Sequence, residues 1–558
     1  MRRESVLAVR PLTNRIASGQ PMALAHPSDP YPDPSWSGWG DPALVPVLPE
    51  AIRTLLAQGL GVRTAPGAPG PITGRRLPAP GLGVDAAGAL TAVVGADNAL
   101  ADDQTRIRHT RGKSTPDLLR MRAGDDAGAP DLVLLPGSHQ QVLDVLQVCS
   151  QRRIAVVPFG GGTSVVGGLE PHAAELEGVV ALDLRRMNAL LELDEDSRLA
   201  VFEPGLRGPQ AEELLGPHGY TIGHFPQSFE YATLGGFAAV RSSGQASAGY
   251  GRFDELVLGL KLAAPAGTWT LGRAPKSAAG PDLRQLILGS EGALGVITSL
   301  TVQIRPAPEQ RVYEGWRFRS FAEGLAAVRK LAQDGPLPTV LRLSDETETA
   351  LNLARPGELG AGAEGCLAIA GYEGSADEVA SRQACATHVL AAAGAGPDPE
   401  AGESWEHDRY RGPYLRDALL DAGALVETLE TVGFWSALPG LYEGVTSALR
   451  ESLSAQGTPP VVLCHVSHVY PAGASLYFTV ACAQAEDPVA QWRTAKAAAS
   501  DAILAAGASI THHHGVGTDH RDWYEREIGE LGVRVLRAVK AELDPAGIMN
   551  PGVLIPPG

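Results

Sequence analysis

The segment Ile154-Ala-Val-Val-Pro158-Phe-Gly160-Gly161-Gly162-Thr163-Ser164 joins an apolar run directly to three consecutive glycines. The apolar run predicts a buried strand. Because glycine has no Cβ, the main-chain N–H groups that follow can approach an anion closely, which predicts a phosphate-binding loop. The segment is neither the G-x-G-x-x-G fingerprint nor the Walker loop, since no lysine follows and no helix obviously opens. A plain tight loop is the alternative interpretation.

The residues before this strand complete a β-α-β crossover. Residues 131–135 are a short apolar run, and Ser138-His-Gln-Gln141 has the form of a capping box, so a helix should begin there. Its apolar residues lie at helical spacing: Val142, Val145, Leu146 and Cys149.

The rest of the chain predicts an α+β protein in two bodies that meet near Pro306. In the first body we expect strands at 179–184, 199–203, 256–264 and 294–305 and a helix at 209–215. In the second we expect strands ending at Phe318 and at 341–343, 367–371, 460–469 and 474–482, with helices at 321–332, 375–393, 487–506 and 521–542. Between 404 and 455 the pattern predicts only helices.

Composition limits the function classes. The 558 residues carry a formal charge of −17, which argues against a general nucleic-acid-binding surface. The five cysteines form no C-x-x-C pair, which disfavours a zinc finger or a disulfide framework. No apolar run reaches the length of a membrane span, and no signal-type apolar region follows Arg2 and Arg3, so we expect a cytoplasmic protein.

Three more loops rich in small residues lie beside predicted strands, at 225–236, 241–244 and 289–298. Together with the glycine loop they resemble the four flavin-contacting segments of the FAD-binding family typified by vanillyl-alcohol oxidase. Within that family the chain is most similar to the alkyl-dihydroxyacetonephosphate synthases. The resemblance runs from Trp36-Ser-Gly-Trp39 to Asn550-Pro-Gly552, and its most specific element is His512-His513-His514-Gly515-Val516-Gly517.

This resemblance implies a PCMH-type FAD-binding domain of two α/β subdomains, followed by a cap domain built on an antiparallel sheet flanked by helices. The domains we expect are an N-terminal loop and helix extension (1–125), the FAD-binding domain (126–308), the substrate or cap domain (309–510) and a C-terminal segment whose triple histidine packs back near the flavin (511–558).

The resemblance also implies that FAD is bound, and that it is bound non-covalently, since relatives with covalent flavin usually offer a histidine in the first glycine loop. Two positions depart from the family, because Gln227 replaces an aspartate and Val240 a threonine. The residues expected to contact FAD are Pro158, Phe159, Gly160, Gly161, Gly162, Thr163, Ser164, Gln227, Ser228, Thr233, Gly236, Arg241, Ser242, Ser243, Glu291, Gly292, Ala293, Gly295, Val296 and Ile297.

Five residues match the catalytic positions of the family, namely Tyr477, Arg342 and the histidines 512–514, and Arg416 matches the arginine that binds the substrate phosphate. In an extended chain His512 and His514 would share one face and His513 the other. A metal site is disfavoured, because no carboxylate lies nearby in sequence before Asp519. A free phenol has a pKa near 10, so Tyr477 would need nearby cations or hydrogen bonds to act near neutral pH, and the histidines and nearby arginines could supply them. Surface or salt-bridge roles are the alternatives for both arginines.

The implied reaction is a redox-neutral exchange of the acyl group of acyl-dihydroxyacetone phosphate for a fatty alcohol, which is a step of ether-lipid synthesis. The partners are then a small lipid phosphate and a fatty alcohol, without nucleic acid. The resemblance also implies a homodimer and leaves peripheral membrane contact open.

Two other functions remain open. An FAD-dependent dehydrogenase or oxidase of a D-2-hydroxy acid such as lactate or glycolate would share the FAD loops. Those enzymes carry G-H-x-G-D-G-N-x-H and E-H-G-x-G, whereas this chain has Tyr470 and Tyr477 at the two histidine positions and His513-His514-Gly515 at the second motif. A flavin-binding scaffold without activity is the other alternative, and the retained tyrosine, arginines and histidines argue against it.

Overall fold

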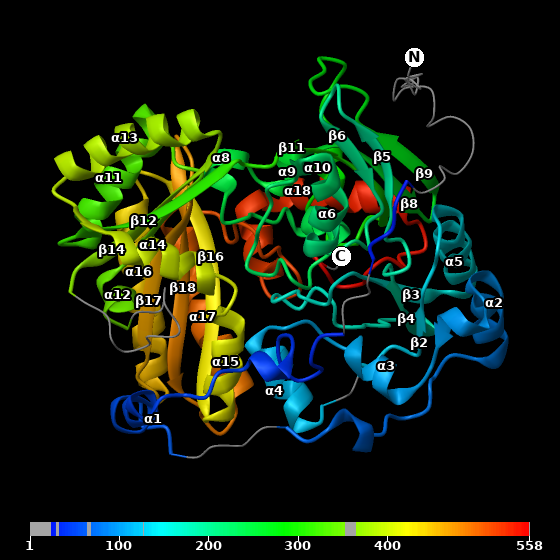
Figure 1. The fold of residues 1–558 in the computed structure, drawn as a ribbon. Helices are drawn as coiled ribbons and strands as arrows, with labels where there is room; N and C mark the ends of the chain where they lie inside the picture. Colours follow the sequence, from blue (N-terminus) through cyan, green and yellow to red (C-terminus); the bar gives the residue numbers. More distant parts are fainter. Residues whose placement is uncertain (1–23, 29–32, 64–68, 126–127, 352–363, 557–558) are drawn as a thin grey trace, which may run out of the picture.

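The computed structural model describes residues 24–28, 33–63, 69–125, 128–351 and 364–556. Figure 1 shows two bodies side by side. The N-terminal body contains the sheets formed by strands β1 to β11, and the C-terminal body contains one seven-stranded sheet formed by β12 to β18. The expected α+β architecture is confirmed, with a mostly antiparallel C-terminal body and a short parallel unit near the start.

The β-α-β crossover forms as expected, from β2 (Leu132–Leu134), α5 (His139–Arg152) and β3 (Ile154–Phe159). The Ser138 hydroxyl accepts from the Gln141 N–H and begins α5, whereas the Gln141 side chain caps the N–H of Gly137. Both strands pair in parallel with β4 (Gly178–Asp183), and β1 (Ala99–Leu100) adds an antiparallel edge. α5 buries its apolar stripe against this sheet and against α2 (Val84–Val94). The glycine loop therefore starts from the end of a buried strand.

A second, antiparallel sheet completes most of the N-terminal body. Its order is β5-β6-β10-β8-β9, and helices α6 (Gly208–Leu215) and α7 (Leu234–Val240) pack into its core. Two short strands, β7 (Tyr220–Thr221) and β11 (Arg305–Pro306), pair beside it. The five strands are β5 (Leu190–Asp194), β6 (Leu199–Phe202), β8 (Val257–Ala264), β9 (Gly267–Leu271) and β10 (Val296–Gln303).

The C-terminal body is an antiparallel sheet with helices packed into a large core on one face. Those helices are α11 (Phe321–Asp334), α13 (Ala376–Ala392), α16 (Leu438–Ala455) and α17 (Pro488–Ala505). The opposite face packs against α14 (Pro399–Asp408) and α15 (Gly412–Asp421). The sheet order is β15 (Gly396–Asp398), β12 (Gln310–Phe318), β14 (Cys366–Gly374), β13 (Val340–Ser344), β17 (Val461–Val469), β18 (Gly473–Ala483) and β16 (Ala424–Phe434).

Strand β16 corrects the sequence analysis, which predicted only helices between 404 and 455. Its eleven residues pair along their whole length with β18. Glu427 and Glu430 are buried within this strand. Carboxylates are depleted both in strands and in protein interiors, so these two residues broke the apolar pattern by which a strand is recognised.

Helix α18 (Arg521–Leu543) joins the two bodies. Its first turn contributes Trp523 and Tyr524 to the core of the C-terminal body, and its end contributes Val539 and Leu543 to the core of the N-terminal body. The chain just before it, which carries the three histidines, is thereby held where the bodies meet. Within the described ranges, no helix combines the length and apolarity that a bilayer crossing requires.

Candidate active site

A cavity of about 450 Å³ lies between the two bodies. The glycine loop and the three other loops rich in small residues line one side, and strands β16 to β18 with helix α15 line the other. Most of the residues expected at the site line this cavity, from one side or the other. They are Pro158, Phe159, Gly160, Gly161, Gly162, Thr163, Ser164, Gln227, Ser228, Thr233, Gly236, Ser242, Ser243, Glu291, Gly292, Gly295, Val296, Ile297, Arg342, Arg416, Tyr477, His513 and His514.

The glycine loop is packed so closely that side chains do not fit. A Cβ on Gly161 would lie 1.9 Å from the main-chain oxygen of Tyr231, and Gly162 has a φ of +70°, which favours glycine. Within the described residues, none of the main-chain N–H groups from Gly160 to Ser164 donates a hydrogen bond. A row of unused donors on a cavity wall fits the diphosphate of FAD.

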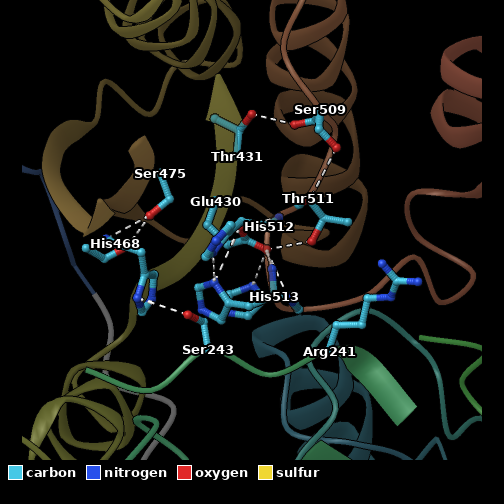
Figure 2. Close-up of polar contacts among 12 residues, drawn as sticks. Arg241, Ser243, Glu430, Thr431, His468, Ser475, Ser509, Thr511, His512 and His513 are labelled. Carbon is cyan, nitrogen blue, oxygen red and sulfur yellow. Dashed lines mark hydrogen bonds and ion pairs between the residues drawn. The ribbon is translucent and has the colours of Figure 1, made fainter. Parts of the chain in front are cut away.

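Three expected residues do not line the cavity, namely Arg241, Ala293 and His512. Figure 2 shows Arg241 pointing away from the histidines. Its guanidinium donates to the carbonyl oxygens of Leu288 and Gln285, so its side chain ties two loops together. A role for this side chain in contacting FAD was expected from the family motif, and its contacts here are with protein instead.

Glu291 lines the cavity, but its carboxylate faces the loop that follows the histidines. It accepts hydrogen bonds from the N–H groups of Val516 and Gly517, at 2.9 to 3.0 Å. The Asn550 amide donates to the Glu291 carbonyl oxygen at 2.7 Å. Burial raises the pKa of Glu291 to about 7, against the opposing effect of the two main-chain donors.

The three histidines belong to a loop folded around one carboxylate. The N–H groups of His512, His513 and His514 donate to Glu430 at 2.6, 3.1 and 2.9 Å, and the Thr511 hydroxyl donates at 2.5 Å. Figure 2 shows this convergence. The expected alternation of faces is therefore wrong, because the segment is a bend and not a strand.

The ring of His512 turns away from the cavity, and the other two rings border it. The Tyr470 hydroxyl lies 2.7 Å from His512 Nε2, and the Nδ1 atoms of His512 and His513 lie 3.0 Å apart. His513 and His514 flank Tyr477, with ring centroids 6.2 and 5.7 Å away. Burial lowers the pKa of all three imidazoles, that of His514 to about 3, so they are neutral at pH 7.

Tyr477 lines the cavity from β18. Its ring stacks on His465, its register partner on β17, with centroids 5.0 Å apart. Burial raises its pKa to about 12, Glu427 and Glu430 act in the same direction, and Thr428 and Arg416 oppose them. The histidines and nearby arginines were expected to favour the phenolate. Arg416 does so, whereas the histidines are neutral, and the carboxylates buried beside the phenol have the opposite effect.

The two expected arginines are each held by a carboxylate. Arg342 forms an ion pair with the fully buried Glu348, which also bonds His465 Nδ1 at 2.9 Å. Arg416 donates to the main-chain oxygen of Lys113 at 2.5 Å and to Asp417 at 3.2 Å. In the described structure the Nε atoms of both arginines are buried without a hydrogen-bond partner. Both guanidinium groups thus keep donor capacity beside the cavity.

Sequence reasoning missed four polar residues that organise this site. Glu430 holds the histidine loop, about 80 residues away in sequence, and Asp417 holds its neighbour Arg416 and the distant Trp39 N–H. His465 lines the cavity beside Tyr477, and His468 bonds the hydroxyls of Ser243 and Ser247 at 3.1 and 2.7 Å. The spacing H-x-x-H within a predicted strand was the one visible signal for the two histidines.

His468 also lies close to the histidine loop. Ring nitrogens of His468, His512 and His513 lie within 4.8 Å of one another. His468 Nδ1 is engaged by the two serine hydroxyls, and His512 Nε2 by Tyr470. The His468 ring also stacks on the His512 ring, with centroids 4.9 Å apart, so it connects the loop to the flavin-side segment 242–247. Figure 2 shows the bond between His468 and Ser243.

One end of the cavity is apolar. Leu415 and Leu419 of α15 and Val426, Val461 and Ala481 of the sheet form one part of it. The rest comes from the N-terminal region, where α1 (Glu50–Thr54) and the turn that follows contribute Ile52, Leu55, Leu56 and Leu60. The N-terminal extension therefore supplies part of the cavity wall.

Comparisons with known proteins agree with this geometry. The family model described as FAD binding domain matches residues 130–271, and the model described as FAD linked oxidases, C-terminal domain, matches residues 307–554. Both expectations, FAD as the cofactor and a PCMH-type fold with a second domain on an antiparallel sheet, are confirmed.

Individual relatives cover most of the chain. It is 36% identical to the alkyldihydroxyacetonephosphate synthase of Dictyostelium discoideum, over 82% of this chain and 78% of that protein. It is 32% identical to the synthase of Trypanosoma brucei brucei, over 95% and 93% of the two chains. A solved structure of an alkyldihydroxyacetonephosphate synthase superposes with a TM-score of 0.78 at 30% identity and covers 93% of this chain and 98% of that one.

Proposed function

The chain belongs to the alkyldihydroxyacetonephosphate synthase family, and we propose that it exchanges the acyl group of acyl-dihydroxyacetone phosphate for a fatty alcohol. The bond between the glycerone carbon and the acyloxy oxygen breaks, and a bond from that carbon to the alcohol oxygen forms. The products are alkyl-dihydroxyacetone phosphate and a fatty acid, so no net oxidation occurs. FAD, when bound, supplies the electronic chemistry at the exchanging carbon.

Arg416 is proposed to bind the substrate phosphate. A guanidinium stays charged at working pH and presents paired donors that match phosphate oxygens. Its contacts with Lys113 and Asp417 hold it in one orientation, and its Nε is without a partner in the described structure. Arg342, held by Glu348 beside His465, is proposed to orient the polar part of the substrate from the other side of Tyr477.

Tyr477 is proposed to move the proton that leaves and returns to the reacting carbon. Its hydroxyl lies between groups of opposite effect, since Arg416 and Thr428 favour the phenolate and Glu427 and Glu430 favour the phenol. His513 and His514 border the same space and are neutral, so their rings can donate to or accept from substrate oxygens. The apolar end beside α1 and α15 is proposed to take the acyl and alkyl chains.

The observation that carries this proposal is the arrangement of Tyr477 between the histidine loop and Arg416 on the wall facing the flavin loops. The test is to incubate the purified holoenzyme with acyl-dihydroxyacetone phosphate and a long-chain alcohol, without an electron acceptor, and to detect the alkyl ether by mass spectrometry. We expect the ether and an equal amount of fatty acid. Absence of ether, together with flavin bleaching by a D-2-hydroxy acid, would move the protein to the oxidoreductase alternative.

We infer from the family that the protein is a homodimer, and peripheral contact with membranes is the open question for its access to lipid substrates. The cytoplasmic location stays a prediction from the sequence. Light scattering of the purified protein measures the oligomeric state. Co-sedimentation with phospholipid vesicles measures membrane contact, and a protein that stays in the supernatant with every vesicle composition would contradict such contact.

A further inference from the structure

Glu430 is the most heavily hydrogen-bonded carboxylate beside the cavity. Its side chain is completely buried, and it accepts from three consecutive main-chain N–H groups and from the Thr511 hydroxyl. Main-chain groups of a bent loop that converge in this way bind an anion strongly, and the bonds are shorter and stronger because the acceptor is charged.

The position of Glu430 relates the loop to the catalytic tyrosine. Glu430 of β16 and Tyr477 of β18 are direct partners in the antiparallel register, so both side chains emerge on the cavity face of the sheet at the same level. The loop that Glu430 holds is therefore placed beside Tyr477, and its two cavity-lining rings flank the phenol. A second carboxylate, Glu291, holds the next residues of the same loop from the other body.

We propose that Glu430 is a positioning residue for the reaction, which fixes the His513 and His514 rings against Tyr477 by binding the main chain of their loop. It does not line the cavity, so it acts through the loop and not by touching substrate. This inference rests on the proposed function, because the histidine rings that Glu430 positions flank Tyr477, which is the group assigned to proton transfer.

Glutamine is the informative substitution. Glu430→Gln keeps the size of the side chain but removes its charge and one acceptor oxygen, so three main-chain donors can no longer converge on it. Glu430→Asp keeps the charge but shortens the side chain by one methylene group, so the carboxylate lies further from the loop. The matched control is Asp544→Asn, which weakens another fully buried carboxylate that accepts main-chain N–H groups, from Ile548 and Met549, and that lies outside the cavity wall.

The holoenzyme of each variant should be assayed for kcat, KM, flavin content and thermal midpoint. For Glu430→Gln we expect kcat to fall by about 100-fold, in the range that loss of acid–base alignment gives, while KM for the phosphorylated substrate and flavin content stay within about twofold. Glu430→Asp should recover part of kcat. Asp544→Asn should lower the thermal midpoint without this selective loss.

A spectroscopic readout separates this inference from the proposed function. The 19F signal of Tyr477 in fluorotyrosine-labelled protein, assigned with Tyr477→Phe, should shift in Glu430→Gln and stay unchanged in Asp544→Asn. A shift with no ether synthesis in any variant would retain the positioning role and reject the proposed reaction. An unchanged signal, or a Glu430→Gln variant whose kcat is normal or whose loss is matched by Asp544→Asn, would overturn the inference.

Discussion

The guanidinium of Arg416 and the main chain of Lys113 link the substrate side of the cavity to the flavin side. Arg416 Nη1 donates to the carbonyl oxygen of Lys113 at 2.5 Å, and the Lys113 N–H donates to the carbonyl oxygen of Ser164 at 2.6 Å. Two hydrogen bonds thus join Arg416, the residue expected to bind the substrate phosphate, to the glycine loop. The distance between Arg416 and the glycine loop is therefore set by the segment before α4 (Thr115–Ala123).

Replacing Arg416 by alanine should raise KM for the phosphorylated substrate by about 10- to 100-fold, because a hydrogen bond to a charged group contributes about 1.5–3 kcal/mol. The affinity for the neutral alcohol should change little. Steady-state kinetics with each substrate varied in turn measures both effects. Arg122→Ala is the control, since Arg122 pairs with Asp421 nearby but does not line the cavity. Equal effects of Arg416→Ala on both substrates would reject the phosphate role.

Tyr477→Phe should lower kcat by at least about 100-fold, since it removes the only atom of the side chain that can carry a proton. Flavin content, measured by absorbance, should not change. Tyr442→Phe removes a hydroxyl that bonds Asp345 outside the cavity, and its kcat should remain near that of the unmodified protein. Near-normal turnover of Tyr477→Phe would remove the assignment.

Gly161→Ala should abolish flavin binding or prevent folding, because its Cβ would overlap the main-chain oxygen of Tyr231, which cannot move as a side chain can. The matched control is Gly444→Ala in the interior of α16, where a Cβ meets nothing within 4 Å. That variant should gain up to about 1 kcal/mol of stability from helix propensity. Flavin absorbance and urea unfolding measure the two outcomes.

The stability of the flavin-free protein should depend on Glu291. Its pKa is about 7 in the folded state and 4.5 in the unfolded reference. Between these values the folded state binds more protons, so this group's contribution decreases as pH rises and is lost above about pH 7. The total change in the contribution of Glu291 to the unfolding free energy is about 3 kcal/mol. The difference in unfolding free energy between the unmodified protein and Glu291→Gln should therefore change by this order between about pH 5 and pH 8. A constant difference would show that Glu291 is ionised throughout.

The flavin should be released by acid. The loop 160–164 offers glycines, a threonine and a serine, none of which forms the usual covalent link to FAD. After precipitation with trichloroacetic acid, all flavin should appear in the supernatant. Yellow colour that remains in the protein pellet would contradict the non-covalent assignment.

The local elements were largely predictable, and strand β16 is the clearest exception. The crossover, the helices of the C-terminal body and strands β17 and β18 follow from periodicity and from a capping serine. Strand β16 did not, because its buried Glu427 and Glu430 resemble surface residues in sequence. Their donors, Thr115 and the histidine loop, lie about 80 to 310 residues away along the chain.

The sequence by itself determined the glycine loop and, through its family motifs, the cofactor class and many of the residues that line the cavity, because main-chain geometry without a Cβ and short motifs are local properties. Tertiary structure alone decided how the histidines face Tyr477, why Arg241 turns away, and which carboxylates hold the site. Those outcomes depend on compensating a buried charge with donors from distant segments, and no local pattern records where such donors will be.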